Sequence, residues 1–193
     1  MLDLNISLKE TVLNGKLPFI EYDAEPLLKE VLKKGNLYIT DSDDSLKEKN
    51  YVVVCIGTPI DEYMAPKIKD FMKCIENISI KCDKETFVII RSSIYPGIFS
   101  RIENIFKRNG INNVSYCPER IVQGYAIREL INLPQIISSN NKRSKEMAKE
   151  FFSHITNNII EADVKEAELA KLFSNAWRYI QFAASNQFAM MAK

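Results

Sequence analysis

Residues 162–193 read ADVKEAELAKLFSNAWRYIQFAASNQFAMMAK, and this last stretch decides how the rest of the chain has to be arranged. It contains no glycine or proline and is rich in alanine, leucine, lysine and glutamate, so it predicts one long helix. At about 1.5 Å per residue, such a helix is roughly 45 Å long. Its apolar residues cover a face too wide for a surface helix, and we therefore expect it to be mostly buried. These residues are Leu169, Leu172, Phe173, Ala176, Trp177, Ile180 and Ala184.

Three polar residues interrupt this apolar surface. Lys171, Asn175 and Arg178 are four and three positions apart, so they lie on one side of a helix. They either form a solvated stripe on a core helix or bring an ammonium and an amide into a functional site, and this segment alone favours neither. Residues 188–193 offer no capping glycine and no proline, so we expect the helix to be truncated.

The middle of the chain alternates between β-branched runs and helical segments. Tyr51-Val-Val-Val-Cys-Ile56 has no polar alternation, which is typical of a strand buried on both faces in a parallel sheet. Thr86–Ile90 and Asn113–Tyr116 predict two further strands, with helices expected at Pro66–Ile78 and Ile98–Lys107. Strands that alternate with helices of about ten residues indicate a doubly wound α/β sheet.

Shorter segments extend this pattern in both directions. Before the first buried run, we expect helices at Asn5–Asn14 and Glu25–Lys34 and a strand at Leu37–Thr40. After the third run, we expect a strand at Pro134–Ser138, a helix at Arg143–Phe152 and a strand at Asn158–Ile160. The predicted fold is an α/β, partial Rossmann-like doubly wound sheet over residues 1–161. The start of the long, mostly buried helix follows over residues 162–193.

Composition and charge exclude several classes of function. The 193 residues are 46% apolar, enough for a core, and the net charge of +1 gives no general attraction to nucleic acid or an anionic membrane. No apolar run reaches the length of a membrane span, and the N-terminus has no secretory pattern. The 4 cysteines form no CxxC pair and His154 is the single histidine, so we expect no metal site and a cytoplasmic location.

Polar, turn-rich segments follow the three buried runs: Gly57-Thr-Pro59, Arg91-Ser-Ser93 and Tyr116-Cys-Pro-Glu119. In a doubly wound sheet, ligands bind outside the carboxyl ends of the strands, where these segments are expected to meet. The simplest ligand for such a sheet is a dinucleotide. Its G-x-G-x-x-G loop is absent, because no two of the 6 glycines are two positions apart.

Asp3 offers a second sign of dinucleotide binding. Met1-Leu-Asp3 could be the end of a strand whose carboxylate binds the adenosine ribose hydroxyls, with the glycine loop about 20 residues upstream. The alternative is that Asp3 is a helix N-cap or a disordered terminal residue, and spacing alone favours this simpler reading.

Several separated motifs then agree with one family. Their order and spacing resemble those of the UDP-sugar 6-dehydrogenases, which include the UDP-glucose and UDP-N-acetylmannosamine dehydrogenases. The resemblance runs from near residue 3 to the end. Chains of this family are about twice as long, so it implies a fragment without the glycine loop and without the C-terminal domain that carries the nucleophilic cysteine. The motifs are Asn14-Gly-Lys-Leu-Pro-Phe19, Val53-Val-Cys-Ile-Gly-Thr-Pro59, Arg91-Ser-Ser-Ile-Tyr-Pro-Gly97, Tyr116-Cys-Pro-Glu-Arg120 and Ala167-Glu-Leu-Ala-Lys-Leu-Phe-Ser-Asn175.

The resemblance implies an activity and a cofactor. The family oxidises the primary alcohol of a UDP-sugar twice with two NAD molecules, through a thiohemiacetal and then a thioester. Gly57, Thr58 and Pro59 resemble the loop that lies along NAD, although a plain strand-to-helix turn is the alternative. Ser92 and Ser93 resemble the Ser-Thr pair near the nicotinamide, with serine replacing threonine at Ser93.

The resemblance also implies the residues that act on the sugar. Glu119 resembles the carboxylate that activates water for thioester hydrolysis; the alternative is a salt bridge to Arg120. Lys171 and Asn175 resemble the pair that stabilises the oxyanion, which now favours the functional reading of the long helix. Cys117 does not match the family's nucleophile.

Arg120 and Gln123 resemble the branch acting on UDP-N-acetylhexosamines, since UDP-glucose enzymes usually carry a glutamate where Gln123 stands. The implied partners are a UDP-sugar and a second copy bound through the long helix, with no nucleic acid and no membrane. Two alternatives stay open. One is a non-catalytic interaction module that keeps the helix as a dimer interface, and the other is a related hydroxyacid or 6-phosphogluconate dehydrogenase.

Overall fold

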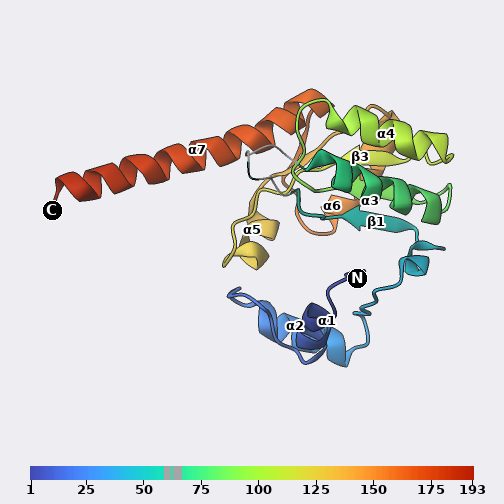
Figure 1. The fold of residues 1–193 in the computed structure, drawn as a ribbon, viewed down its shortest axis with the longest axis horizontal. Helices are drawn as coiled ribbons and strands as arrows, with labels where there is room; N and C mark the ends of the chain where they lie inside the picture. The colour runs from blue at the N-terminus through green and yellow to red at the C-terminus, as the bar shows by residue number, and fades with distance from the viewer. Residues whose placement is uncertain (59–61, 63–66) are drawn as a thin grey trace.

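The β-branched runs form a parallel sheet at the centre of the molecule. The computed structural model describes residues 1–58, 62 and 67–193 (Figure 1). Strands β1 (Tyr51–Val54), β2 (Phe87–Ile90) and β3 (Val114–Tyr116) pair in the order β1-β2-β3, all parallel. A second parallel pair, β4 (Gln135–Ile137) and β5 (Ile159–Glu161), continues from β3 through an antiparallel bridge between Tyr116 and Ser138. The predicted strands in this part of the chain are confirmed.

Helices cover both faces of the sheet, as double winding requires. Helices α3 (Ile68–Lys81) and α4 (Ile98–Arg108) share one core with Val88 and Ile90 of β2. Helix α6 (Lys142–Ser153) packs on the other face against Phe87 and Ile89. Neighbouring residues of β2 point to opposite faces, so all four are buried. The predicted fold class is confirmed.

Strand β1 departs from the expectation of burial on both faces. Val52 and Val54 are buried, whereas Tyr51 and Val53 are 47% and 41% exposed. The reason is position: β1 ends the strand order, and helix α6 packs mainly on β2, β3, β4 and β5, so it reaches β1 only at its edge, where the Phe151 ring lies 5.5 Å from the Tyr51 ring.

The N-terminal segment forms a smaller unit beside the sheet. Helices α1 (Ile6–Leu13) and α2 (Ala24–Lys33) enclose a core of Val12, Leu28 and Ile39. The predicted strand Leu37–Thr40 is wrong as a strand: only Thr40 pairs, in a parallel bridge with Leu2. The Tyr38 carbonyl next to this bridge accepts from the Met1 ammonium at 2.6 Å, and no second ladder pair forms among the described residues there. A short 3₁₀ helix, η1 (Asp43–Leu46), then leads into β1.

The long helix α7 (Val164–Met191) begins with a capping box in which Asp163 and Glu166 cap each other's backbone. Its predicted extent is confirmed, but the expectation that it is mostly buried is wrong. Only Val164, Ala167, Glu168 and Lys171 are buried, and the rest projects away from the sheet (Figure 1). The physical reason is length, because a helix of 28 residues extends about 40 Å and the sheet domain covers only its first turns. No helix in the described part of the chain is long and apolar enough to cross a membrane.

A buried carboxylate fixes the base of α7. Glu168 is fully buried and accepts hydrogen bonds from the backbone N–H groups of Gly97 (2.8 Å) and Phe99 (3.0 Å). These groups begin α4, whose N-cap Gly97 has φ 88° and no capping side chain of its own. Glu168 therefore caps α4 from a different helix, about 70 residues later in the chain.

Replacing Glu168 by alanine removes both bonds and leaves the buried Phe99 N–H and the partly buried Gly97 N–H without this acceptor. We expect Glu168→Ala to lower the free energy of unfolding by about 2–4 kcal/mol. Glu146→Ala, which removes an exposed carboxylate from α6, should change it by less than about 0.5 kcal/mol. Urea unfolding of the three proteins measures both; equal losses would contradict the capping role.

The projecting part of α7 predicts self-association. Phe173, Trp177 and Ile180 lie along one side of the helix and are 65%, 61% and 58% exposed. We expect the apparent mass of the chain to rise with concentration in light scattering, and the double variant Phe173→Glu/Trp177→Glu to stay monomeric. Tyr179→Glu on another side of α7 is the matched control, and a concentration-independent monomer for the unmutated chain would refute the prediction.

Candidate functional site

The described residues of the three polar segments meet at the carboxyl edge of the sheet, as predicted. The backbone N–H of Arg91 donates to Val54 and that of Cys117 donates to Ile90, both at 2.9 Å, so the exits of β1, β2 and β3 lie side by side. The Thr58 hydroxyl also donates to the Ser93 carbonyl at 2.8 Å, which joins the first two exits.

The described residues that are predicted to hold the cofactor at these exits differ in burial and in hydrogen bonding. Thr58 and Ser93 are in contact, and an added Cβ at Gly57 would meet open space. Ser92 is buried and its hydroxyl donates to the Val54 carbonyl at 3.4 Å, so it is turned into the sheet. Pro59 lies outside the described residues.

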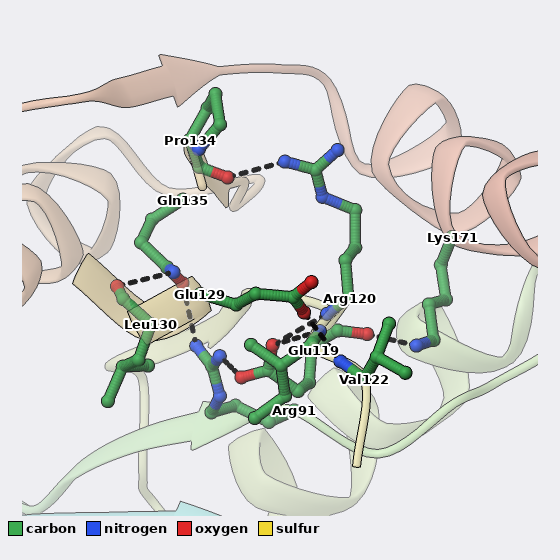
Figure 2. A network of polar contacts seen from close by, with 10 residues as sticks. Arg91, Glu119, Arg120, Val122, Glu129, Leu130, Pro134, Gln135 and Lys171 are labelled. Atoms are coloured by element: carbon green, nitrogen blue, oxygen red, sulfur yellow. Dashed lines mark hydrogen bonds and ion pairs between the residues drawn. The ribbon is translucent and has the colours of Figure 1, made fainter. Parts of the chain in front are cut away.

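Glu119 lies at the centre of a polar network (Figure 2). One carboxylate oxygen accepts the backbone N–H groups of Arg120 (2.7 Å) and Ile121 (2.8 Å). The other forms an ion pair with the guanidinium of Arg91. The alternative of a salt bridge between Glu119 and Arg120 is wrong, because the Arg120 guanidinium donates to the Pro134 carbonyl at 2.6 Å.

Lys171 brings α7 into this network. Its ammonium donates to the main-chain carbonyl of Glu119, and the residue is only 8% exposed. One and two turns further along α7 lie the half-buried Asn175 and Arg178, and Arg178 donates to the Arg120 carbonyl at 3.4 Å. A solvated stripe is therefore excluded for Lys171.

The surroundings of Lys171 disfavour its charge. Burial lowers the pKa of the Lys171 ammonium, and the nearby cations Arg178, Arg120 and Arg91 lower that pKa further. The Lys171 side chain is thus held close to Glu119 in a positive, poorly solvated setting, which is suited to an oxygen that gains negative charge.

Arg91 is the main residue of the site that sequence reasoning left without a role. It is buried, its Nη1 donates to the Gln135 side chain at 3.3 Å, and its guanidinium lies 5.0 Å from the centre of the Phe152 ring. The only sequence signal was an arginine directly after a fully apolar strand. Such a charge needs an acidic partner, and Glu119 follows the next strand.

The far side of the Glu119 loop is held by carboxylates that the sequence did not single out. Glu129 accepts the Val122 N–H at 2.6 Å, and Glu21 accepts the N–H groups of Gly124 and Ala126. Those last two groups lie at the start of helix α5 (Ala126–Asn132), which was not predicted. Glu21 is more than 100 residues away in the chain, so no local pattern could reveal it.

Asp3 lies at the end of the parallel bridge made by Leu2. Its backbone N–H donates to the Thr40 carbonyl at 3.0 Å, and its carboxylate accepts the Asn5 N–H at 2.9 Å. The N-cap alternative is wrong for Asp3, because Asn5 is the N-cap of α1. Binding of ribose hydroxyls by Asp3 stays a prediction.

Cys117 lies within the site's core, and its thiol is unsuited to nucleophilic attack. The residue is fully buried, and burial raises the pKa of the thiol to about 12. Among the described residues, no three His, Cys, Asp or Glu side chains gather as a metal ion would require.

Comparisons with known proteins agree with this geometry. A family model described as "UDP-glucose/GDP-mannose dehydrogenase family, NAD binding domain" matches residues 1–156. The UDP-N-acetyl-D-mannosamine dehydrogenase of Pyrococcus horikoshii is 28% identical over 98% of this chain and 47% of its own length. The enzyme of the same name from Methanocaldococcus jannaschii is 30% identical over 90% of this chain and 41% of its own.

Solved structures extend the likeness to three dimensions. The structure of UDP-D-ManNAc dehydrogenase from P. horikoshii has a TM-score of 0.89 and 26% identity, and the match covers 99% of this chain and 47% of that one. GDP-mannose dehydrogenase from Pseudomonas aeruginosa shares the fold, with a TM-score of 0.84, 21% identity and coverage of 96% and 45%. The chain therefore spans about half the length of the relatives it matches.

The depressed pKa of Lys171 predicts a pH-dependent contribution to stability. Between that lowered pKa and the ordinary value of 10.5, the unfolded chain binds a proton that the folded chain does not, so folding gains stability as pH rises. We expect the unfolding free energy of the wild type to increase relative to Lys171→Met over this alkaline window. Lys165→Met, at an exposed lysine of the same helix, controls for loss of a lysine from α7. Urea unfolding at several pH values tests this, and a pH-independent difference between the two variants would exclude it.

Proposed function

Because this chain belongs to the UDP-glucose/GDP-mannose dehydrogenase family, we propose that it is the NAD-binding half of an enzyme that oxidises the C6 alcohol of a UDP-sugar to a carboxylate. The observation that carries the proposal is the contact between Lys171 and Glu119 at the carboxyl edge of the sheet. A helix and two strand exits there bring a buried amine and a carboxylate to one place, where a doubly wound sheet binds its ligands.

NAD is the cofactor of this family, and the residues at the sheet edge are compatible with it. Gly57 leaves open space at the exit of β1, and the hydroxyl-bearing Thr58 and Ser93 lie together beside it. We propose that Gly57, Thr58 and Pro59 lie along NAD, that Ser93 approaches the nicotinamide and that Asp3 binds the adenosine ribose. Ser92, bonded into the sheet, would support this turn from behind. When bound, NAD accepts hydride from the substrate carbon.

The polar network supports separate roles for three side chains. Lys171 and Asn175, one turn apart on α7, would stabilise negative charge on the reacting oxygen, because fixed donors in a poorly solvated site need no reorganisation. Glu119 would take a proton from the water that hydrolyses the thioester, and its carboxylate is already ordered by two N–H donors and Arg91.

An N-acetylated UDP-sugar is the substrate we favour. The P. horikoshii and M. jannaschii relatives are UDP-N-acetyl-D-mannosamine dehydrogenases by name. Gln123 stands where UDP-glucose enzymes usually carry a glutamate, and together with Arg120 it resembles the branch acting on UDP-N-acetylhexosamines. Arg120 lies directly beside Glu119 and is anchored at Pro134, so its position is fixed relative to the proposed base.

We also propose a homodimer formed through α7, supported by its exposed apolar side, and a cytoplasmic location.

We expect the 193-residue chain alone to be inactive with NAD and UDP-sugars, because it contains no G-x-G-x-x-G loop. The test of function is therefore a chimera in which this chain replaces the matching segment of the P. horikoshii enzyme. It should oxidise UDP-N-acetylmannosamine and form two NADH per sugar. A chimera that folds and binds NAD but oxidises no UDP-sugar would contradict the proposal and favour an interaction module built on α7.

Variants of this chimera separate the proposed roles. Lys171→Ala should lower kcat by about 10²–10³ with little change in NAD affinity, because Lys171 lies on α7 and not on a strand exit. Asn175→Ala should combine with it less than additively. Glu119→Gln should still transfer the first hydride and accumulate a covalent thioester, detectable by mass spectrometry of the intact protein. Abolished turnover without an adduct would exclude the hydrolytic role of Glu119.

A further inference from the structure

The proposed function does not explain why the charged side chain of Arg91 is buried. Its side chain is 8% exposed, at the point where β2 leaves the core. Removing a guanidinium from water is unfavourable, and such a group is kept where its partners are arranged around it. Burial opposes this charge by lowering the pKa of Arg91, and a neighbouring carboxylate acts against that shift. The charge must therefore serve a partner.

Buried partners fix the orientation of the guanidinium. Gln135, only 3% exposed, accepts from Nη1 at 3.3 Å and is itself held by a bond to the Leu130 carbonyl at 3.4 Å. The ring of Phe152 covers one face at 5.0 Å. With one edge and one face occupied, the Nη2 edge is directed at a single group, the Glu119 carboxylate (Figure 2).

The Glu119 carboxylate is held from two directions. Arg91 contacts one oxygen, while the N–H groups of Arg120 and Ile121 donate to the other. Both kinds of contact favour the ionised form, and together they define the plane of the carboxylate. The Glu119 side chain stays 26% exposed, so water can reach it.

We propose that Arg91 is a positioning residue for Glu119: its guanidinium keeps the carboxylate ionised and oriented, and so sets the pH below which Glu119 stops acting as a base. The catalytic meaning of this role rests on the proposed function, whereas the coupling between Arg91 and Glu119 does not. Other charged or titratable groups face the pair from every side. They are Arg120 on the same loop, Lys171 and Arg178 on α7, Glu129 on α5, Cys117 after β3 and Cys55 after β1.

The shape of the guanidinium matters in addition to its charge. A lysine at position 91 would supply a point charge, but it could not donate to Gln135 from one edge and form the ion pair with Glu119 from another while lying against Phe152. Arg91→Lys should therefore preserve part of the charge effect and lose the orientation. This separates a positioning role from a merely structural one.

The experiment is a pH titration of Glu119 in the 193-residue chain, followed by NMR of ¹³C-labelled glutamate carboxyl groups and assigned with Glu119→Gln. We expect the wild-type midpoint to lie below about 4.3, the value for glutamate in a short peptide. Arg91→Gln should make Glu119 bind its proton at least about tenfold more tightly, and Arg91→Lys should fall between the two. Arg101→Gln, which removes an exposed arginine of α4, should leave the midpoint unchanged.

Two results would overturn the proposal: a wild-type midpoint at or above the peptide value, or equal midpoints in the wild type and Arg91→Gln. If Arg91→Gln does not fold, the wild-type midpoint and Arg91→Lys decide the question. In the chimera, Arg91→Lys should move the acid limb of the kcat profile upward with KM unchanged. A shifted NMR midpoint with an unmoved acid limb would retain the coupling and reject Glu119 as the base, which separates failure of the proposed function from failure of this inference.

Discussion

The arrangement of the site depends on two buried charges at the base of α7. Glu168 accepts the backbone N–H groups that begin α4, and Lys171, one turn later, donates to the Glu119 carbonyl. Glu168 fixes α7 against helix α4, and Lys171 fixes α7 against the loop that follows β3. Because both are buried, rotation of α7 would leave an N–H pair and an ammonium without partners, which is costly inside a protein. The orientation of the helix and the composition of the site are therefore set by the same turn.

The Glu119 loop shows how a segment without regular structure is ordered by distant residues. Arg91 holds it from β2, Lys171 holds it from α7 and Glu21 holds it from the N-terminal unit. The ring of Tyr22 lies 5.4 Å from that of Tyr125, and Asp23 forms an ion pair with Arg128 at 3.0 Å. Each tie comes from a different part of the chain, so a change far from the carboxylate can alter its position.

Whether a feature could be predicted from the sequence depends on how far apart in the chain the interacting residues lie. The β-branched run at Phe87–Ile90 and the four-residue spacing of Lys171 and Asn175 are local patterns, and they predicted a buried strand and a shared helix face. The pairs Arg91–Glu119 and Glu21–Gly124 join residues 28 and 103 positions apart, and only the assembled fold brings them together. The apolar face of α7 was read correctly as apolar but wrongly as buried. The sequence shows which side of a helix is apolar, whereas its burial depends on whether another surface packs against that side.

The length of the projecting helix α7 amplifies small changes in its tilt. About 30 Å of α7 extends beyond Lys171, given about 1.5 Å of rise per residue. A tilt of about 5° at the base would thus displace the far end by about 3 Å, whereas a hydrogen bond is lost when its donor and acceptor move apart by less than about 1 Å. The contact between Lys171 and the Glu119 carbonyl lies near the start of α7, where such a tilt would originate. Any surface docked on the far end of α7 is therefore mechanically connected to the loop that holds Glu119, with no intervening hinge in the helix.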